Sequence, residues 1–545
     1  MKKKNVIFIV IDAVRSYKSG LDERDKLEVF DQLAEREFFV LDKLVVSAPS
    51  SLMSSITMLT GLPSFSLAQN YNDFKWEEDL YNVIPSNLSE IGYDCYGLFG
   101  AKEMRDKLKD IFPSIQKEIL PKGIKITQRN WNNQSLLKVV ENACEVSIDT
   151  SENPFFLMTW FNSRFDTETS AIIDQLLSYL SKKSYYDDSL IIVTADHGYP
   201  DQRRGLTSDG PDLKKSGKPH DLIVTDDNIC VPLAIRFPTD YAENKTFLDK
   251  FPKRHISQAL PQECLVPSIS EVLDLNLKEK PLMPSRGSIR NELFEPNNSP
   301  IRTDARFMFQ PNRITSVRVS DRKYVIDREQ NEEFCYDLIN DPAEKEKLSS
   351  SDINIADLKE FYEDSESEAF MMWAGKVSKN LDNIALEKFI HNGIFNVFYL
   401  GSTNFINPIL MSLKKYNVKI HLHSNIKTLS LIEKGLFDTH SKLEKKLQVQ
   451  KALVFVEDSL NPDFIDLLRL INARSIGIVD PYMNIYSSRR KLVLRSFINW
   501  ALGPFKRMVF KKEVYRSHPA LFFDDIIYII NRIILLIYKK VKSFF

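Results

Sequence analysis

Three side chains that could act together follow two apolar runs of the chain. Asp12 comes directly after Val6–Ile11, and Asp196 with His197 follows Leu190–Val193. Short apolar runs of this kind are typical of buried strands, and the carboxyl ends of parallel strands meet at one edge of an α/β sheet. Two carboxylates and an imidazole suit a divalent cation. The pattern therefore predicts a metal site at that edge.

A hydroxyl is predicted at the same edge. Ser51 opens the segment 51–61, SLMSSITMLTG, where a helix is expected to begin. The free N–H groups and dipole of a helix N-terminus favour an anion, and a metal beside a hydroxyl can activate it as a nucleophile. Two simpler interpretations stay open. Asp12 could only cap a turn, and Ser51 could serve helix capping within a serine-rich run. The other serines of that run are Ser47, Ser50, Ser54 and Ser55.

Five segments resemble, in order and spacing, the sulfatase branch of the alkaline phosphatase superfamily. They are Asn5–Arg15 (NVIFIVIDAVR), Ala48–Gly61 (APSSLMSSITMLTG), Asp187–Tyr199 (DDSLIIVTADHGY), Lys218–Pro238 (KPHDLIVTDDNICVPLAIRFP) and Phe334–Pro342 (FCYDLINDP). The resemblance covers roughly residues 1–350. It implies an α/β fold, an alkaline-phosphatase-like sandwich with a central mixed, mostly parallel sheet.

The resemblance also implies roles for individual residues. Ser51 would be the nucleophile, and His220 would protonate the leaving group or steady the anion. The implied metal ligands are Asp12, Ser51, Asp196 and His197. The implied contacts to the anionic ester are Arg15, Arg164 and Lys218. Solvated surface positions are the alternative for Arg15, Lys218 and His220.

A departure from the family pattern favours phosphate over sulfate chemistry. Ordinary sulfatases carry a Cys or Ser followed by x-Pro-x-Arg, which is converted to formylglycine. Residues 51–55 read Ser-Leu-Met-Ser-Ser, without that proline and arginine. An unmodified Ser51 hydroxyl is therefore expected to attack, and a phosphoserine can be resolved by water or by an alcohol. A sulfuric ester hydrolase is the alternative.

A second departure concerns the number of metal ions. Two-metal members of the superfamily take an Asp and a His from the segment after a strand that corresponds here to Pro154–Trp160. The segment Phe161–Phe165 offers neither, and Arg164 within it would clamp phosphate. Ala13 stands where the usual Asp-Asp pair has its second residue. We therefore expect one divalent ion (Mn, Ca, Mg or Zn), as in phosphoglycerol transferases that use an unmodified hydroxyl.

Length and composition indicate a multidomain globular protein. The chain has 545 residues, 43% of them hydrophobic, and a formal net charge of -1. The predicted domains are a catalytic domain at 1–350, a helical linker at 351–392, a small α/β (Rossmann-like) domain at 393–485 and a basic helical tail at 486–545. Five scattered cysteines, an odd number, argue against a disulfide framework and for a reducing, cytoplasmic location.

The small domain is predicted from strands that alternate with helices. The expected strands are Asn396–Leu400, Val418–Leu422, Ala452–Val456 and Ser475–Val479, with helices near Asn407–Lys415 and Asp463–Ile471. This alternation indicates a parallel sheet. The turn Gly401–Thr403 could cradle a phosphate, and a scaffold or protein-binding role is the alternative.

Both ends of the chain have features that are relevant to membrane association. The N-terminal apolar run is too short for a secretory signal and is interpreted as the first strand; no uninterrupted apolar stretch suggests a spanning helix. Between Pro481 and Phe545 there are 13 Lys and Arg against three acidic residues, followed near the end by the apolar segment Phe522–Tyr538. Such a tail fits peripheral contact with the inner face of a membrane. A helix packed on the small domain is the alternative, and nothing else indicates nucleic acid.

The sequence thus predicts a metal-dependent hydrolase or transferase of phosphate or sulfate esters. Its anionic substrate is expected in surface-polysaccharide or lipid-linked glycan metabolism. A catalytically silent member of the family that only binds its ligand is the alternative from another functional class.

Overall fold

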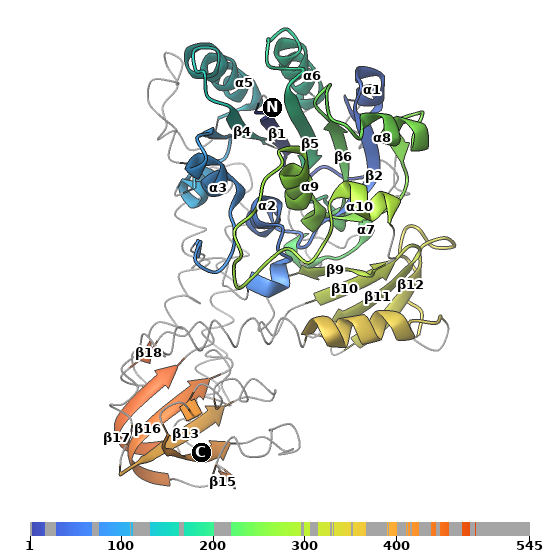
Figure 1. Ribbon diagram of the computed structural model, residues 1–545. Coiled ribbons are helices and arrows are strands. Elements are labelled where there is room, and N and C mark those ends of the chain that lie inside the picture. Colours follow the sequence, from blue (N-terminus) through green and yellow to red (C-terminus); the bar gives the residue numbers. More distant parts are fainter. Residues whose placement is uncertain are drawn as a thin grey trace, which may run out of the picture. The chain divides into compact units, whose positions relative to one another are not determined.

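The computed structural model divides into two compact units, Met1–Met372 and Trp373–Phe545 (Figure 1). The described residues are 3–16, 29–67, 76–109, 111–112, 131–162, 168–200, 220–295, 299–305, 314–327, 330, 332–349, 353–366, 390, 392–400, 410, 413–414, 417–424, 438–442, 447–456, 471–479 and 485–486. Arg164, Lys218, the Gly401–Thr403 turn and the predicted tail beyond Tyr486 lie outside them.

An eight-stranded sheet forms the centre of the first unit, in the order β3-β4-β1-β5-β6-β2-β7, with β8 also paired to β2. These strands are β1 Asn5–Ile11, β2 Phe39–Val45, β3 Asp94–Phe99, β4 Phe155–Phe161, β5 Ser189–Ala195, β6 Cys230–Arg236, β7 His255–Ile256 and β8 Leu260–Pro261. Only β6 is reversed, because it pairs antiparallel with both β5 and β2. The sheet is therefore mixed and mostly parallel, which confirms the predicted fold class.

The reversal of β6 decides where the polar residues meet. Since β6 is antiparallel to both neighbours, β2 runs in the same direction as β5 and β1. The carboxyl ends of β1, β5 and β2 therefore share one edge of the sheet. Every residue of β1 and β5 is buried, which explains why their sequences are continuous apolar runs rather than alternating ones.

Two groups of helices accompany this sheet. In one group α6 contacts both α1 and α5; in the other, α2 contacts α3 and α9, and α9 contacts α10. The α-helices are α1 Val29–Leu33, α2 Ser51–Thr60, α3 Ile84–Glu90, α4 Lys102–Leu108, α5 Asn133–Ala143, α6 Thr169–Leu180, α7 Asp226–Ile229, α8 Asn244–Lys250, α9 Leu265–Val272 and α10 Ile289–Phe294. A short π-helix, Cys144–Ile148, extends α5. The 3₁₀ turns are Ala34–Arg36, Ser64–Leu67, His220–Leu222 and Gln262–Cys264.

A second, antiparallel sheet in the same unit has the order β12-β11-β10-β9. Its strands are β9 Ile301–Ala305, β10 Ile314–Val319, β11 Arg322–Asp327 and β12 Glu332–Asp337, and helical residues 356–366 pack against it (Figure 1). Strand β9 also joins the loop that leads to α2, because Asp304 N–H donates to Ser47 O at 2.9 Å.

The second unit holds a six-stranded sheet in the order β15-β14-β13-β16-β17-β18. Its strands are β13 Ile394–Leu400, β14 Lys419–Ser424, β15 Thr439–Lys442, β16 Leu447–Val456, β17 Ile471–Val479 and β18 Ile485–Tyr486. All pairs are parallel except β17 with β18, so the predicted parallel α/β sheet is confirmed. The prediction was wrong in some details. Strands β15 and β18 were not predicted, and Ile471, predicted as the end of a helix, begins β17.

Two further observations concern the length of the helices and the state of the cysteines. No helix of the described ranges is long and apolar enough to cross a membrane. All five cysteines are described, and each is a buried free thiol.

Candidate active site

Strand register places the two carboxylates side by side. Ile11 at the end of β1 is paired with Ala195 at the end of β5, and Asp12 and Asp196 are the next residues on each strand. Ligand atoms of Asp12, Asp196 and His197 all lie within 4.8 Å of one another. No other group of three such residues is found in the described part of the chain. The predicted metal-binding residues are thus brought together.

The Asp196 carboxylate is oriented by two backbone donors. Its Oδ1 accepts the N–H groups of Ala13 at 2.9 Å and of His197 at 2.8 Å. Ala13 reaches this position in a left-handed conformation, with φ of 59°. The other oxygen, Oδ2, is buried and has no hydrogen-bond partner among the described residues. Burial raises the pKa of this carboxyl, while the backbone hydrogen bonds act in the opposite direction.

A buried carboxylate oxygen without a partner is the feature that fits a cation. Such an atom costs stability unless something neutralises and coordinates it. Half-buried Asp12 and buried His197 complete an oxygen- and nitrogen-rich set around it. The residues present therefore suit a divalent ion.

His197 has a defined tautomer because of its neighbour. Its Nδ1 lies 2.6 Å from Gly198 O, and a carbonyl can only accept, so Nδ1 carries the proton. Nε2 then presents a lone pair, 3.0 Å from Ser51 Oγ and 3.7 Å from Asp196 Oδ2. A backbone carbonyl that fixes the far nitrogen is the usual support of a metal-binding histidine.

Ser51 is the first residue of α2, at the carboxyl end of β2. Ser50 occupies the N-cap and makes no capping hydrogen bond with its side chain. Other serines of the run serve packing: Ser47 Oγ accepts Ser64 N–H, and Ser54 Oγ accepts Gln262 Nε2. Half-buried Ser51 is instead directed at His197, with the first N–H groups of α2 behind it.

His220 and Arg15 lie at the same place. The His220 ring stacks on His197 with centroids 5.0 Å apart and on Tyr199 with centroids 5.5 Å apart. Arg15 Nε donates to Tyr199 O. Tyr199 belongs to a motif quoted from the sequence, but no role was predicted for it, because a contact through its backbone and ring face leaves no signal in residue type.

The residue after β4 has a structural contact. Asn162 Nδ2 donates to Trp131 O at 2.5 Å, and its backbone N–H donates to Asn133 Oδ1 at 2.9 Å. Its amide is therefore engaged with the segment that precedes α5. Arg164 and Lys218, predicted to contact the substrate, lie outside the described residues.

Comparisons with known proteins give structural likeness only. No protein-family model matches the chain, and a search of curated proteins found no similar sequence. A 2-O GAG sulfatase is similar in structure with a TM-score of 0.49 and 14% identity, over 68% of this chain and 93% of its own. The phosphonate monoester hydrolase of Agrobacterium radiobacter gives 0.47 and 14%, over 67% and 95%. A protein of the alkaline phosphatase superfamily from Vibrio parahaemolyticus gives 0.44 and 13%, over 62% and 79%.

Sulfatases and the alkaline phosphatase superfamily are the class that the sequence motifs resemble.

Proposed function

We propose that this chain is a metal-dependent hydrolase or transferase of phosphate esters with Ser51 as nucleophile, in the sulfatase branch of the alkaline phosphatase superfamily. The observation that carries the proposal is the buried Asp196 Oδ2, which has no hydrogen-bond partner among the described residues and lies beside Asp12, His197 and Ser51. A bound divalent ion, proposed as one per chain, would stabilise the charge on the Ser51 oxygen and on the ester. Engagement of the Asn162 amide by Trp131 supports a single ion.

The chain's own residues account for the remaining steps. With a metal bound, the Ser51 hydroxyl would lose its proton to solvent more readily, and the Ser51 oxygen then attacks phosphorus in line. The Oγ–P bond forms while the bond from phosphorus to the leaving oxygen breaks. His220, stacked on His197, gives its proton to that oxygen. Water or an acceptor alcohol then resolves the phosphoserine. Arg15, Arg164 and Lys218 are proposed to bind the anionic ester.

Phosphate is preferred because residues 51–55 lack the proline and arginine of the formylglycine maturation motif. We expect mass spectrometry of the peptide containing Ser51, taken after incubation with an aryl phosphate, to show plain serine or phosphoserine. Formylglycine at position 51 would instead favour the alternative, a sulfuric ester hydrolase. A preparation that binds no metal and forms no phosphoserine at position 51 would favour the other alternative, a catalytically silent member of the family that only binds its ligand.

We propose a cytoplasmic location with peripheral membrane contact, and a glycan or lipid-linked ester as substrate. The five free cysteines support a reducing compartment. The basic and apolar composition of the tail supports contact with anionic lipid, at about 1 kcal/mol for each well-placed Lys or Arg.

Truncation after Ala520 is therefore expected to release the protein from anionic vesicles without changing turnover of a small soluble phosphate ester. Binding of the full chain should weaken as salt concentration rises, because screening reduces the attraction. Vesicle flotation over a salt series measures both effects. If the truncated protein unfolds, or the full chain ignores anionic vesicles, the tail belongs to a folded domain.

A further inference from the structure

The turn formed by α7 supports the loop that carries His197. Asp227 O accepts the N–H of Tyr199 at 2.9 Å, and Asn228 O accepts the N–H of Gly198 at 2.8 Å. The approach is so close that a Cβ atom at Gly198 would lie 2.3 Å from Asp227 O. The position of the loop after β5 is thus set by the backbone of α7.

The same turn holds the segment of His220. The fully buried Asn228 side chain donates from Nδ2 to His220 O at 2.7 Å and to Ile223 O at 2.6 Å. One amide therefore joins the first residue of the 3₁₀ turn His220–Leu222 to the residue that follows the turn. Because α7 contacts the residues around His197 and His220 alike, it fixes the stacked pair.

Buried charges from the second sheet anchor α7. Asp226 Oδ2 accepts Arg318 Nη1 of β10 at 2.8 Å, and Asp226 Oδ1 accepts Lys323 Nζ of β11 at 3.0 Å. Glu344 accepts Lys323 Nζ at 2.7 Å and also the backbone N–H of Asp226. Burial alone would raise the pKa of Asp226, but Arg318 and Lys323 outweigh it and hold that pKa well below its usual range.

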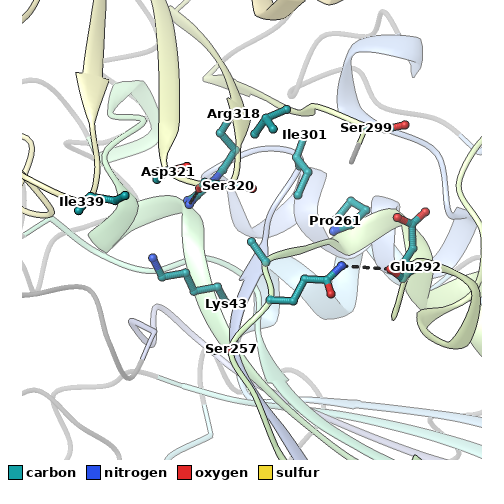
Figure 2. A pocket seen from close by; sticks show the side chains of 13 residues that line it. Lys43, Ser257, Pro261, Glu292, Ser299, Ile301, Arg318, Ser320, Asp321 and Ile339 are labelled. Atoms are coloured by element: carbon teal, nitrogen blue, oxygen red, sulfur yellow. Dashed lines mark hydrogen bonds between the residues drawn. The ribbon is translucent and has the colours of Figure 1, made fainter. Parts of the chain in front are cut away.

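The cluster of charged residues around Asp226 is buried, but it borders a cavity. Lys43 of β2 lies 3.8 Å from Asp226 Oδ2, which makes three cations around two carboxylates. Lys43 and Arg318 line a cavity of about 370 Å³ (Figure 2). The Arg318 side chain is only 3% exposed and that of Lys43 26%. Solvent therefore reaches the cluster mainly beside Lys43, and the bonds of Asp226 to Arg318 and Lys323 are shielded.

We propose that α7 is the positioning element of the catalytic histidines, with Asp226 and Asn228 as positioning residues held by the charges of the second sheet. The inference rests on the proposed function for its catalytic part. The proposal gives strands β10 and β11 a role in positioning the site, although they contribute none of the proposed site residues. Asp226 acts through the backbone of α7, and Asn228 acts through the segment of His220.

A double-mutant cycle tests the second link. Asn228→Ala is expected to lower kcat about tenfold while leaving the Mn²⁺ affinity unchanged, because no proposed ligand is touched. In a His220→Ala background the same change should lower kcat by less than about twofold, since residues that act through one another are not additive. Equal losses in both backgrounds would overturn the role of Asn228.

Arg318→Met tests the anchor, with Arg236→Met as the matched control. Arg236 is also a buried, ion-paired arginine and ends β6, the strand that follows α7, but it lies at the opposite edge of the sheet. Both variants lose a buried cation. We expect Arg318→Met alone to lower kcat, by about tenfold at a temperature where both variants are folded. Equal kcat values for the two variants would overturn the role of the cluster.

Imidazole NMR signals of histidine-labelled full-length protein give a readout that needs no turnover. Arg318→Met should shift the signals of His197 and His220, assigned with single His→Gln variants, and Arg236→Met should not. Shifted signals without hydrolysis of any phosphate or sulfate ester would defeat the proposed function and leave the positioning inference intact. If the His197 and His220 signals do not shift in Arg318→Met although the wild-type protein is an active enzyme, the positioning inference is wrong.

Discussion

Ser51→Ala is expected to lower kcat on p-nitrophenyl phosphate by at least about 10³-fold, as the loss of a covalent nucleophile does in other enzymes. Ser51 Oγ is the hydroxyl that lies 3.0 Å from His197 Nε2, at the start of α2. The variant keeps Asp12, Asp196 and His197 and loses only a neutral hydroxyl, so its Mn²⁺ affinity should fall by about tenfold at most, less than the loss of a charged ligand would cause. Steady-state kinetics and metal titration on the same preparation separate the two effects.

Ser50→Ala is the matched control. Ser50 is the neighbouring residue and the N-cap of α2, but its side chain makes no capping hydrogen bond. Its removal should therefore change kcat by less than about twofold and cost less than the roughly 1 kcal/mol of an engaged cap. If Ser51→Ala kept more than a tenth of wild-type turnover, Ser51 would not be the nucleophile.

Asp196→Asn should remove the metal and the activity together. The amide can keep an oxygen toward the N–H groups of Ala13 and His197, but it places a neutral NH₂ where Oδ2 now lies. Loss of an outer-shell partner commonly costs 10- to 100-fold in metal affinity, so loss of a ligand should cost about 100-fold or more. Elemental analysis should find about one ion per wild-type chain, and none in the variant.

Thermal unfolding gives an independent check of the role of Asp196, because the direction of the expected change in stability can be derived from its pKa. Burial raises the pKa of Asp196 above its unfolded value in the absence of a cation. Stability from this group is therefore fully present below the unfolded pKa and lost as pH rises through the folded pKa. At neutral pH the metal-free Asn variant should be at least as stable as metal-free wild type. Mn²⁺ at about 100 times its Kd should stabilise only wild type, by about 2.7 kcal/mol.

His197→Ala is expected to behave as Asp196→Asn does in metal content and turnover. His255→Ala, at an exposed histidine of β7, is the control and should keep both. Two tightly bound ions per wild-type chain, or a full complement of metal in Asp196→Asn, would contradict the proposed site.

Much of the site could be predicted because its residues follow strong local signals. The runs Val6–Ile11 in β1 and Leu190–Val193 in β5 are apolar throughout, so both strands and the residues that follow them can be recognised from the sequence. The parallel pairing of Ile11 with Ala195 then brings Asp12 and Asp196 together. Ser51 could not be chosen from a local pattern alone, because several serines lie in the same segment. The resemblance to the family motif distinguished it from them.

Other parts had no local signal. The reversal of β6 depends on long-range pairing with β2 and β5, and it decides that Ser51 reaches the same edge. The cluster of Asp226 joins residues about a hundred positions apart, as with Arg318 and Lys323. Each of these charges alone is indistinguishable from a solvated surface residue.

The left-handed backbone at Ala13 leaves an evolutionary route open. Its φ of 59° is a conformation that aspartate and asparagine adopt more readily than alanine, so the backbone at this position suits an acidic residue. In the sulfatase motif that this segment resembles, an aspartate is usual at the corresponding position. A family with this turn can therefore gain or lose a carboxylate, and with it a preference among metal ions, by changing one side chain while the scaffold stays the same.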